Sequence, residues 1–403
     1  MKKFKRVFVI VMDSVGIGSE PDADHFYNAG HNDDRSNTWV HISEKMNGLN
    51  VPTMNSLGLH DIGPVLGTET VQHPHSYVQT LRERSNGKDT LTGHWEMMGI
   101  LTENPLVTFT DTGFPKELMD ELSKRTGRKL IGNYSQSGTV ILQELGEQSI
   151  KEGSLIVYTS ADSVLQIAAN TAVVTLQELY KDCEIAREIT MKPEWKVGRI
   201  IARPFIGDKK ENFKRTSDRR DLSLEPAGNT SLDDLVKNGK EVIAVGKIHD
   251  IFAGRGMNES YHIENNHDGM TRTLDIASNR DFEGFCFVNL ADFDVLYGHR
   301  RDPIGYGKCL EEFDKDLAEI IKVLKDDDLL MITADHGNDP TWWGTDHTRE
   351  RVPLISYSSS YKNGRLISER ESFADIGKTI LKNFGVEPSA NEIGVSIDQL
   401  LED

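Results

Sequence analysis

Short apolar segments alternate along the chain with longer segments in which apolar residues recur at helical spacing. The clearest apolar segments are residues 7–12, 155–158, 242–245, 285–290 and 329–333. Between the last two, with charged residues interspersed, lie Leu310, Phe313, Leu317, Ile320, Ile321 and Leu324. This order predicts a strand–helix–strand unit, and a further helix over residues 373–384 follows the apolar run 353–357. The whole pattern predicts an α/β fold with a mostly parallel sheet covered by helices.

Polar residues suited to chemistry directly follow several of these predicted strands. Asp13 follows the first segment, Lys247 follows the segment 242–245, and the last segment leads to Asp335 and His336. The segment 285–290 leads to Asp292, Asp294 and His299. Ligands bind outside the carboxyl ends of strands in open α/β sheets, so these residues should meet at one edge. One Asp after a strand can simply be a turn or a helix cap, but several strand ends with Asp and His indicate a site.

The middle of the chain differs in its sequence pattern and indicates a separate domain. A length of 403 residues predicts two domains, because one core rarely grows that large. Residues 105–224 contain a helical stretch at 116–128, the strand-like run 155–158 and a run rich in Arg and Lys at 198–220. We therefore expect a discontinuous metal-binding core of residues 1–104 and 225–403, interrupted by an inserted domain of residues 105–224.

Composition narrows the choice of partners. The formal net charge of -18 argues against nucleic acid or an anionic membrane as the main partner, but not against a small anionic substrate. Three widely spaced cysteines suit a reducing cytoplasm. The apolar run at 7–12 is too short for a secretory signal, whose core has roughly 7–15 residues, and no stretch approaches a membrane span. We expect a cytoplasmic protein with no obligate protein partner.

The Asp and His residues suit a pair of divalent metal ions. Asp335 and His336 are followed by Asp346 and His347, and Asp294 is followed by His299. With Asp13 these provide six candidate ligands, which are Asp13, Asp294, His299, Asp335, His336 and His347. Mixed oxygen and nitrogen ligands favour Mn²⁺, although Zn²⁺ or Mg²⁺ stays possible. Two neighbouring ions commonly catalyse phosphoryl transfer, for which Thr90 is the candidate nucleophile. Alternatively, Thr90 is an ordinary helix cap and the other residues are scattered caps and surface histidines.

A family resemblance makes the chemistry specific. The segment GKDTLTGHWEMMG at 87–99 resembles the nucleophile motif of bacterial phosphopentomutases, within the alkaline phosphatase superfamily. Further similar segments are VMDSVGIG at 11–18, PDAD at 21–24, YTSADSVLQIAA at 158–169, GRIIARPF at 198–205, NLADFDVLYGHRRDP at 289–303, ITADHGNDP at 332–340 and GTDHTRE at 344–350. The resemblance implies an alkaline-phosphatase-like core with an inserted α/β cap domain. It also implies that Asp13, Asp335 and His336 hold one metal, that Asp294, His299 and His347 hold the other, and that Thr90 is phosphorylated.

The same resemblance implies the substrate and its contacts. The expected activity is that of an isomerase of nucleoside and pentose phosphate metabolism, which interconverts (deoxy)ribose 1-phosphate and 5-phosphate through a 1,5-bisphosphate. A sugar bisphosphate primer, such as ribose 1,5-bisphosphate or glucose 1,6-bisphosphate, would load Thr90. The residues expected to hold the sugar phosphate are Asp162, Arg199, Arg203, Arg215 and Lys247.

Some positions depart from the family pattern. Arg220 stands where relatives usually have His, and Asn37 and Val40 stand where Asp and Gly are usual. The loop 207–213 also has fewer Gly and Pro residues than is usual. Two alternatives remain at this point. One is another phosphoryl transferase of the superfamily, such as a phosphoglycerate mutase or a phosphatase, and the other is a non-catalytic metal-binding relative.

Overall fold

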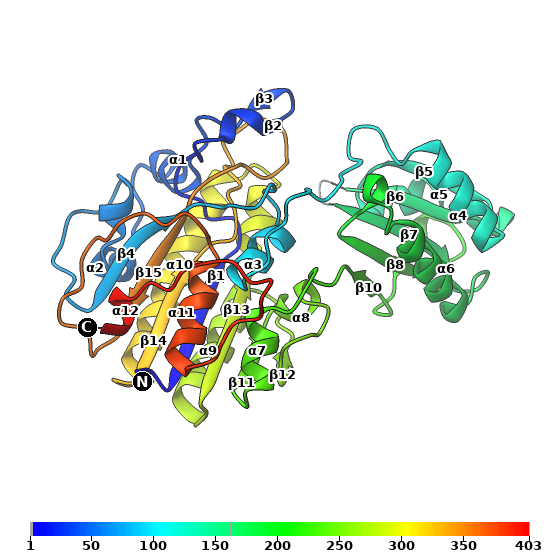
Figure 1. Cartoon of the computed structure of the whole chain (residues 1–403). Coiled ribbons are helices and arrows are strands. Elements are labelled where there is room, and N and C mark those ends of the chain that lie inside the picture. Colours follow the sequence, from blue (N-terminus) through cyan, green and yellow to red (C-terminus); the bar gives the residue numbers. More distant parts are fainter. Residues whose placement is uncertain (1–2, 161–162, 403) are drawn as a thin grey trace. The chain divides into compact units, whose positions relative to one another are not determined.

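The computed structural model describes residues 3–160 and 163–402, which divide into two units (Figure 1). Unit 1 consists of Met1–Pro105 and Pro226–Asp403, and unit 2 consists of Leu106–Glu225. Each unit is built around its own sheet. Within the described residues, no helix combines the length and the apolar character that crossing a membrane requires.

The sheet of unit 1 has seven strands in the order β12-β11-β13-β1-β14-β15-β4. The five strands from β12 to β14 run parallel, whereas β15 is antiparallel to both β14 and β4. The strands are β1 (Arg6–Met12), β4 (Ser76–Leu81), β11 (Glu241–Val245), β12 (Glu259–Tyr261), β13 (Gly284–Leu290), β14 (Asp328–Thr333) and β15 (Val352–Tyr357). All five apolar segments singled out in the sequence lie in strands, four of them in this sheet.

Strand β1 lies at the centre of the parallel part, between β13 and β14. Every residue of β1 is buried, as expected for a strand covered on both faces. The register pairs Met12 with Leu290 and Val11 with Thr333, so the carboxyl ends of the three strands lie level. The predicted strand–helix–strand unit is β13–α10–β14, in which the crossover passes β1 instead of joining two neighbours.

Two groups of helices pack on this sheet. The first group contains α1 (Thr38–Lys45), α2 (Pro52–Ser56), α9 (Asn266–Asn279) and α10 (Pro303–Val323). The second contains α3 (Thr90–Met97), α7 (Ser231–Lys237), α8 (Ile248–Ile251) and α11 (Asp375–Phe384), and α12 (Gln399–Glu402) ends the chain. Helix α10 begins where Asp302 accepts a hydrogen bond from the Gly305 N–H, and it buries the predicted apolar face, which includes Leu310 and Leu317.

Unit 2 has a mixed sheet in the order β10-β8-β7-β6-β5, with β9 added to β8. The strands are β5 (Leu130–Ser135), β6 (Leu155–Thr159), β7 (Val164–Asn170), β8 (Arg199–Ile206), β9 (Lys214–Arg215) and β10 (Arg220–Ser223). Alternation along β6 separates two cores. Leu155 and Val157 pack with α4 (Lys116–Thr126) and α6 (Leu176–Ile189), whereas Ile156 and Tyr158 pack with α5 (Gly138–Glu152).

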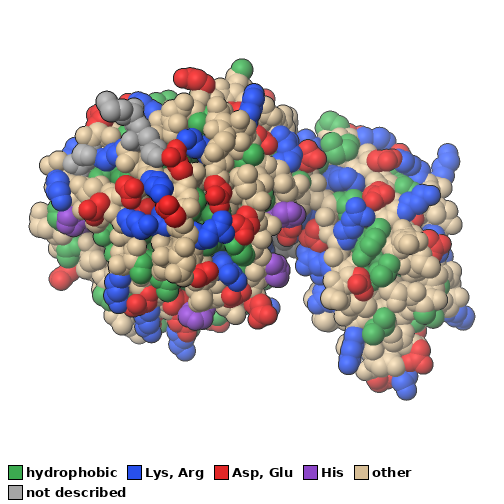
Figure 2. Space-filling view, turned by 90° about the horizontal axis from the view of Figure 1, so that it is seen from below, with side chains coloured by type: hydrophobic (Ala, Val, Ile, Leu, Met, Phe, Trp, Pro, Cys, Tyr) green, Lys and Arg blue, Asp and Glu red, His purple; other side chains and the backbone are tan. Residues whose placement is uncertain are grey.

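The surfaces of both units mix the two signs of charge. Figure 2 shows basic and acidic side chains interspersed over the face that it draws.

Candidate metal centre

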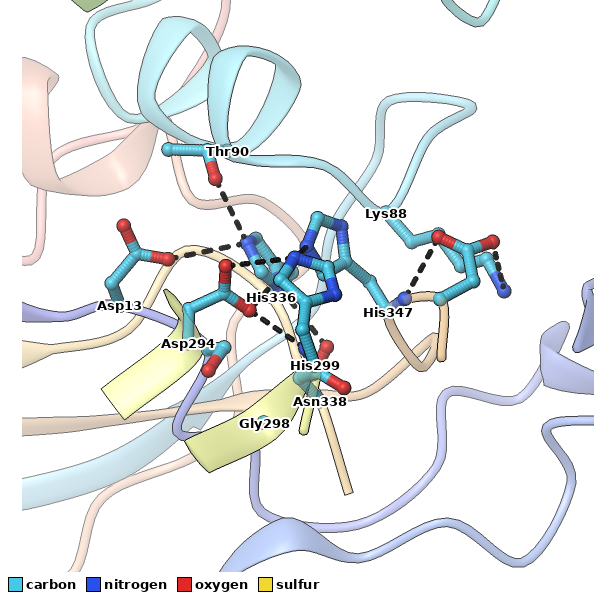
Figure 3. Close-up of polar contacts among 12 residues, drawn as sticks. Asp13, Lys88, Thr90, Asp294, Gly298, His299, His336, Asn338 and His347 are labelled. Atoms are coloured by element: carbon cyan, nitrogen blue, oxygen red, sulfur yellow. Dashed lines mark hydrogen bonds and ion pairs between the residues drawn. The ribbon is translucent and has the colours of Figure 1, made fainter. Parts of the chain in front are cut away.

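Four of the residues expected at the sheet edge lie close together at the carboxyl ends of β13, β1 and β14, namely Asp13, Asp294, Asp335 and His336 (Figure 3). Asp13 directly follows β1, and Asp335 with His336 follows β14. Asp294 lies in the short π-helix Phe293–Gly298 after β13. Because neighbouring strand ends lie level, residues more than 280 positions apart in the sequence come together here.

The first group of candidate ligands is Asp13, Asp335 and His336, whose ligand atoms lie within 4.8 Å of one another. His336 Nε2 is 3.5 Å from Asp13 Oδ1 and 3.4 Å from Asp335 Oδ2. The remaining carboxylate oxygens are already engaged, because Asn289 Nδ2 donates to Asp13 Oδ2 at 2.9 Å and the Ser14 N–H donates to Asp335 Oδ1 at 3.0 Å. One oxygen of each carboxylate is thus held, and the other faces His336.

The two oxygens that face His336 make no hydrogen bond, although they are buried. Burial alone would lower the pKa of His336, but Asp335, Asp13 and Asp294 outweigh it and raise the pKa well above its ordinary value. His94 Nδ1 also lies 3.1 Å from Asp335 Oδ2. Buried carboxylate oxygens cost free energy unless positive charge compensates them. This donor set, two carboxylates and an imidazole, fits a divalent metal ion.

The second group surrounds Asp294. Asp294, His336 and His347 offer ligand atoms within 4.8 Å of one another. Asp294 Oδ1 is 3.4 Å from His347 Nε2, and Asp294 Oδ2 is 3.1 Å from His299 Nε2. His299 and His347 bring their Nε2 atoms within 3.2 Å. Burial raises the pKa of Asp294, but His299 and His347 outweigh it and hold the pKa well below its usual range. This carboxylate therefore stays ionised and available to a cation.

Hydrogen bonds to the backbone orient two of the histidines. His336 Nδ1 donates to the Gly337 carbonyl at 3.0 Å, and His299 Nδ1 donates to the Thr345 carbonyl at 2.7 Å. A carbonyl oxygen can only accept, so the neutral form of each ring keeps its lone pair on Nε2. Both Nε2 atoms point into the site, as is usual for histidines that bind metals.

Thr90 is the first residue of α3, and its hydroxyl faces the first group of ligands (Figure 3). Thr90 Oγ1 lies 3.2 Å from His336 Nε2. The alternative that Thr90 is the helix cap is wrong, because Asp89 caps the helix by accepting from the Thr92 N–H at 3.1 Å. Helix α3 can approach β14 closely because residue 93 is glycine, where a Cβ atom would lie 2.1 Å from the Asp335 carbonyl oxygen.

Four residues at the site did not stand out in the sequence. Asn289 holds Asp13, and its Nδ2 also lies 3.3 Å from Nε2 of His94. Asn338 Nδ2 donates to Asp294 Oδ1 at 2.7 Å, and the guanidinium of Arg301 donates to Asn338 Oδ1. Asn289 and Asn338 lie in the quoted motifs, but an amide side chain carries no signal of its own until the fold shows its partner.

Of the five residues expected to bind the sugar phosphate, one lies in unit 1, three lie in unit 2 and one falls outside the described residues. Lys247 lies in unit 1, after β11, and lines a pocket of about 180 Å³ whose wall also includes Asn289 and Asp292. Arg199, Arg203 and Arg215 lie on β8 and β9 of unit 2. Asp162 falls outside the described residues.

Two of the departures from the family pattern have local roles. Arg220 lies on β10, where its guanidinium contacts Glu184 of α6 at 3.1 Å and lies 5.4 Å from the ring centroid of Tyr180. Asn37 caps α1 by accepting from the N–H of Val40 at 3.2 Å, which an Asp could do equally well. These contacts are local to α6 and to the first turn of α1.

Comparison with known proteins assigns the family. The family model described as the Metalloenzyme superfamily matches residues 5–388. The phosphopentomutase of Clostridium beijerinckii is 54% identical over 98% of this chain and 99% of its own length. Those of Clostridium tetani and Agathobacter rectalis are also 54% identical, with the same shares covered. This chain belongs to the phosphopentomutase family.

Membership of the phosphopentomutase family confirms several expectations from the sequence. The resemblance itself, the α/β fold of the alkaline phosphatase superfamily and the assignment to the isomerases are confirmed. The two groups of buried Asp and His residues, together with the superfamily match, support binding of divalent metal. The roles of individual residues, the identity of the metal and the primer are matters for the proposal below.

Proposed function

We propose that this phosphopentomutase interconverts (deoxy)ribose 1-phosphate and (deoxy)ribose 5-phosphate through a phosphothreonine at position 90. The observation that carries the proposal is the position of the Thr90 hydroxyl, 3.2 Å from His336 Nε2 and beside two groups of candidate metal ligands. A hydroxyl is a weak nucleophile at neutral pH, and divalent metal held by the neighbouring ligands would favour its alkoxide.

Asp13, Asp335 and His336 would hold one Mn²⁺, and Asp294, His299 and His347 would hold the other, with His336 also within reach of the second group. Bound metal would supply positive charge that stabilises the nucleophilic and leaving oxygens and the transferring phosphoryl group. Among this chain's own groups, the start of helix α3 would add to the positive field near a phosphate on Thr90, although Asp89 already accepts from the Thr92 N–H.

Further residues of the chain would hold the substrate. Lys247, Arg199, Arg203 and Arg215 would bind the distal phosphate or sugar oxygens, and Asp162 would accept from a sugar hydroxyl. Burial, followed by the charge of Arg219, lowers the pKa of Arg203 to about 10, so a bound phosphate would relieve repulsion in that part of unit 2.

The reaction would proceed by two transfers. The phosphoryl group leaves Thr90 Oγ1 for the anomeric oxygen of the 5-phosphate, whose proton passes to Thr90 Oγ1, and the 1,5-bisphosphate forms. After the bisphosphate reorients, Thr90 Oγ1 takes the phosphoryl group from position 5, its proton passes to the 5-oxygen, and the 1-phosphate remains. Hydrolysis would remove the phosphate from Thr90. A primer such as ribose 1,5-bisphosphate or glucose 1,6-bisphosphate would then phosphorylate Thr90 again.

A cytoplasmic location belongs to the same proposal. Cys183, Cys286 and Cys309 are buried and free, which suits a reducing compartment. Pentose phosphates and sugar bisphosphates, the proposed substrates and primers, are soluble metabolites that such an enzyme would meet there.

Mass spectrometry of the full chain tests the proposal. After incubation with Mn²⁺ and glucose 1,6-bisphosphate, we expect one added phosphate on the peptide that contains Thr90. Thr90→Ala should lose both this phosphate and the turnover of ribose 1-phosphate, whereas Thr80→Ala, which removes an exposed hydroxyl on β4 bonded to Glu369, should keep both. A fully active Thr90→Ala variant, or turnover of phosphoglycerate or nitrophenyl phosphate in place of ribose 1-phosphate, would contradict the proposal.

A further inference from the structure

The side chain of Arg349 is buried next to the segment that leads to Thr90. Its exposed fraction is 2%, and all three of its guanidinium nitrogens donate hydrogen bonds. We propose that Arg349 is a positioning residue that fixes Thr90 relative to the metal-ligand loop carrying His347. The inference rests on the proposed function, because it assigns Arg349 a part in the phosphorylation of Thr90.

Arg349 holds the nucleophile segment, residues 83–90, by its carbonyl oxygens. Nη1 donates to the carbonyls of Ser85 at 2.9 Å and Gly87 at 2.5 Å, and Nη2 donates to the carbonyl of Glu83 at 2.7 Å. Nη1 also donates to the Glu83 carboxylate at 2.8 Å. The last of the three carbonyls belongs to a residue only three positions before Thr90. A displacement of the guanidinium therefore reaches the nucleophile through a very short length of chain.

Glu96 holds the N–H side of the same segment. Its carboxylate accepts from the N–H groups of Arg84 at 2.9 Å and Ser85 at 2.5 Å, and also from Ser372 and Phe373. Hydrogen bonds thus hold the segment both by its N–H groups and by its carbonyl oxygens, and the two sets connect it to different parts of unit 1. Glu96 ties it to residues 372–373, whereas Arg349 ties it to the loop of metal ligands.

The backbone around Arg349 belongs to that loop. The preceding residue, Thr348, exchanges backbone hydrogen bonds with Gly337 at 2.9 and 3.2 Å, which joins the loops of His347 and His336. The Arg349 N–H donates to Asp33 Oδ2 at 3.1 Å, and the same oxygen accepts from Lys88 Nζ at 2.9 Å. Arg349 therefore connects the residues just before Thr90 with both histidine loops.

Arginine suits this position better than lysine would. Nε and Nη2 both donate to the Asp22 carboxylate at 3.1 Å. The planar guanidinium therefore donates to two carboxylates and three carbonyl oxygens. Burial lowers the pKa of Arg349, but Glu83, Asp22 and Glu20 outweigh it and raise the pKa, so the charge is permanent. A lysine offers three donors from one nitrogen and cannot reproduce these contacts.

The test compares Arg349→Lys with Arg351→Lys in the full-length protein loaded with Mn²⁺. Arg351 lies two residues further on, donates to the Ser19 carbonyl at 2.9 Å and pairs with Glu369, but does not contact the nucleophile segment. We expect Arg349→Lys to slow single-turnover phosphorylation of Thr90 by glucose 1,6-bisphosphate by about 100-fold, because misplacement of about 1 Å has that effect on reactive geometry. We expect its kcat to fall by a similar factor. Its KM should stay within about 3-fold of the wild-type value, since Arg349 touches no substrate.

Three results would overturn the inference. The first is a phosphorylation rate in Arg349→Lys that equals the wild-type rate. The second is phosphorylation of Thr90 that is slowed equally in Arg351→Lys and follows a loss of thermal stability. If Arg349→Lys does not fold, Asp22→Asn loosens the fork from a partly exposed position, and an unchanged phosphorylation rate in that variant would be the contradiction. A wild-type chain that never carries phosphate on Thr90 would instead overturn the proposed function, and this inference with it.

Discussion

The two units differ in the charge of the side chains that gather at their candidate binding residues, acidic in unit 1 and basic in unit 2. At the strand ends of unit 1, Asp13 and Asp335 each keep a buried carboxylate oxygen without a hydrogen bond. In unit 2, Arg203 is half-buried on β8, where Nε donates to the neutral side chain of Gln166 at 3.0 Å. Bound cations would compensate the first region, and a bound anion would compensate the second. In the proposed function, unit 1 therefore holds the metal and unit 2 offers positive charge to a phosphate.

The largest effect should come from removing one charge at the cation site. We expect Asp335→Asn to lower kcat for ribose 1-phosphate on the order of 10³-fold or more, because a ligand of the first group and its charge are lost together. Steady-state kinetics at saturating Mn²⁺ measures this. Asp120→Asn, which alters an exposed carboxylate on α4 that pairs with Lys116, is the control and should keep wild-type turnover. Turnover within a few-fold of wild type in Asp335→Asn would mean that this carboxylate does not hold a metal.

The next largest effect should come from removal of metal, which we expect to destabilise unit 1 and not unit 2. A ligand at 100 times its Kd stabilises the folded state by about 2.7 kcal/mol, and here that free energy should appear in unit 1 alone. Hydrogen exchange with Mn²⁺ and with EDTA is the measurement. We expect EDTA to speed exchange in β1, β13 and β14, while β6 and β7 exchange at the same rate in both conditions. Equal changes in both sheets would contradict the division of roles.

A smaller effect should follow from weakening the anion site. Arg203→Met should raise KM about 10- to 150-fold with kcat nearly unchanged, because a charge-assisted hydrogen bond of roughly 1.5–3 kcal/mol is lost. Arg220→His is the matched control in the same unit. It removes an exposed pair with Glu184, and we expect KM to stay within about 2-fold. A larger rise in KM for Arg220→His than for Arg203→Met would place the substrate contacts elsewhere in unit 2.

Much of the fold and of the candidate metal centre was predictable from the sequence. The predicted strands of unit 1 are continuous apolar runs because they are buried on both faces, and Asp13 and the pair Asp335–His336 follow the ends of β1 and β14. Strand β4 was missed, because its sequence, SYVQTL, includes polar residues that are buried by tertiary contacts. The antiparallel direction of β15 was also not evident, since a short apolar run carries no information about the direction of its neighbour.

The supporting residues of the site could not be predicted for a related reason. Asn338 is identified only by its contact with Asp294, which lies 44 positions away, and Arg349 by contacts with residues more than 260 positions away. Nor could the sequence show that His336 lies within reach of both groups of ligands. These features depend on which strand ends become neighbours, and local patterns do not encode that.

The central claim is that the strand ends of unit 1 form a centre for two metal ions, and counting the bound ions tests it most directly. Native mass spectrometry of the full-length chain at saturating Mn²⁺ should show two ions per chain. Asp335→Asn should lower the count to one, and so should Asp294→Asn, because each variant damages a different group. A wild-type chain that binds no ion or only one, or variants that both still bind two, would contradict the account.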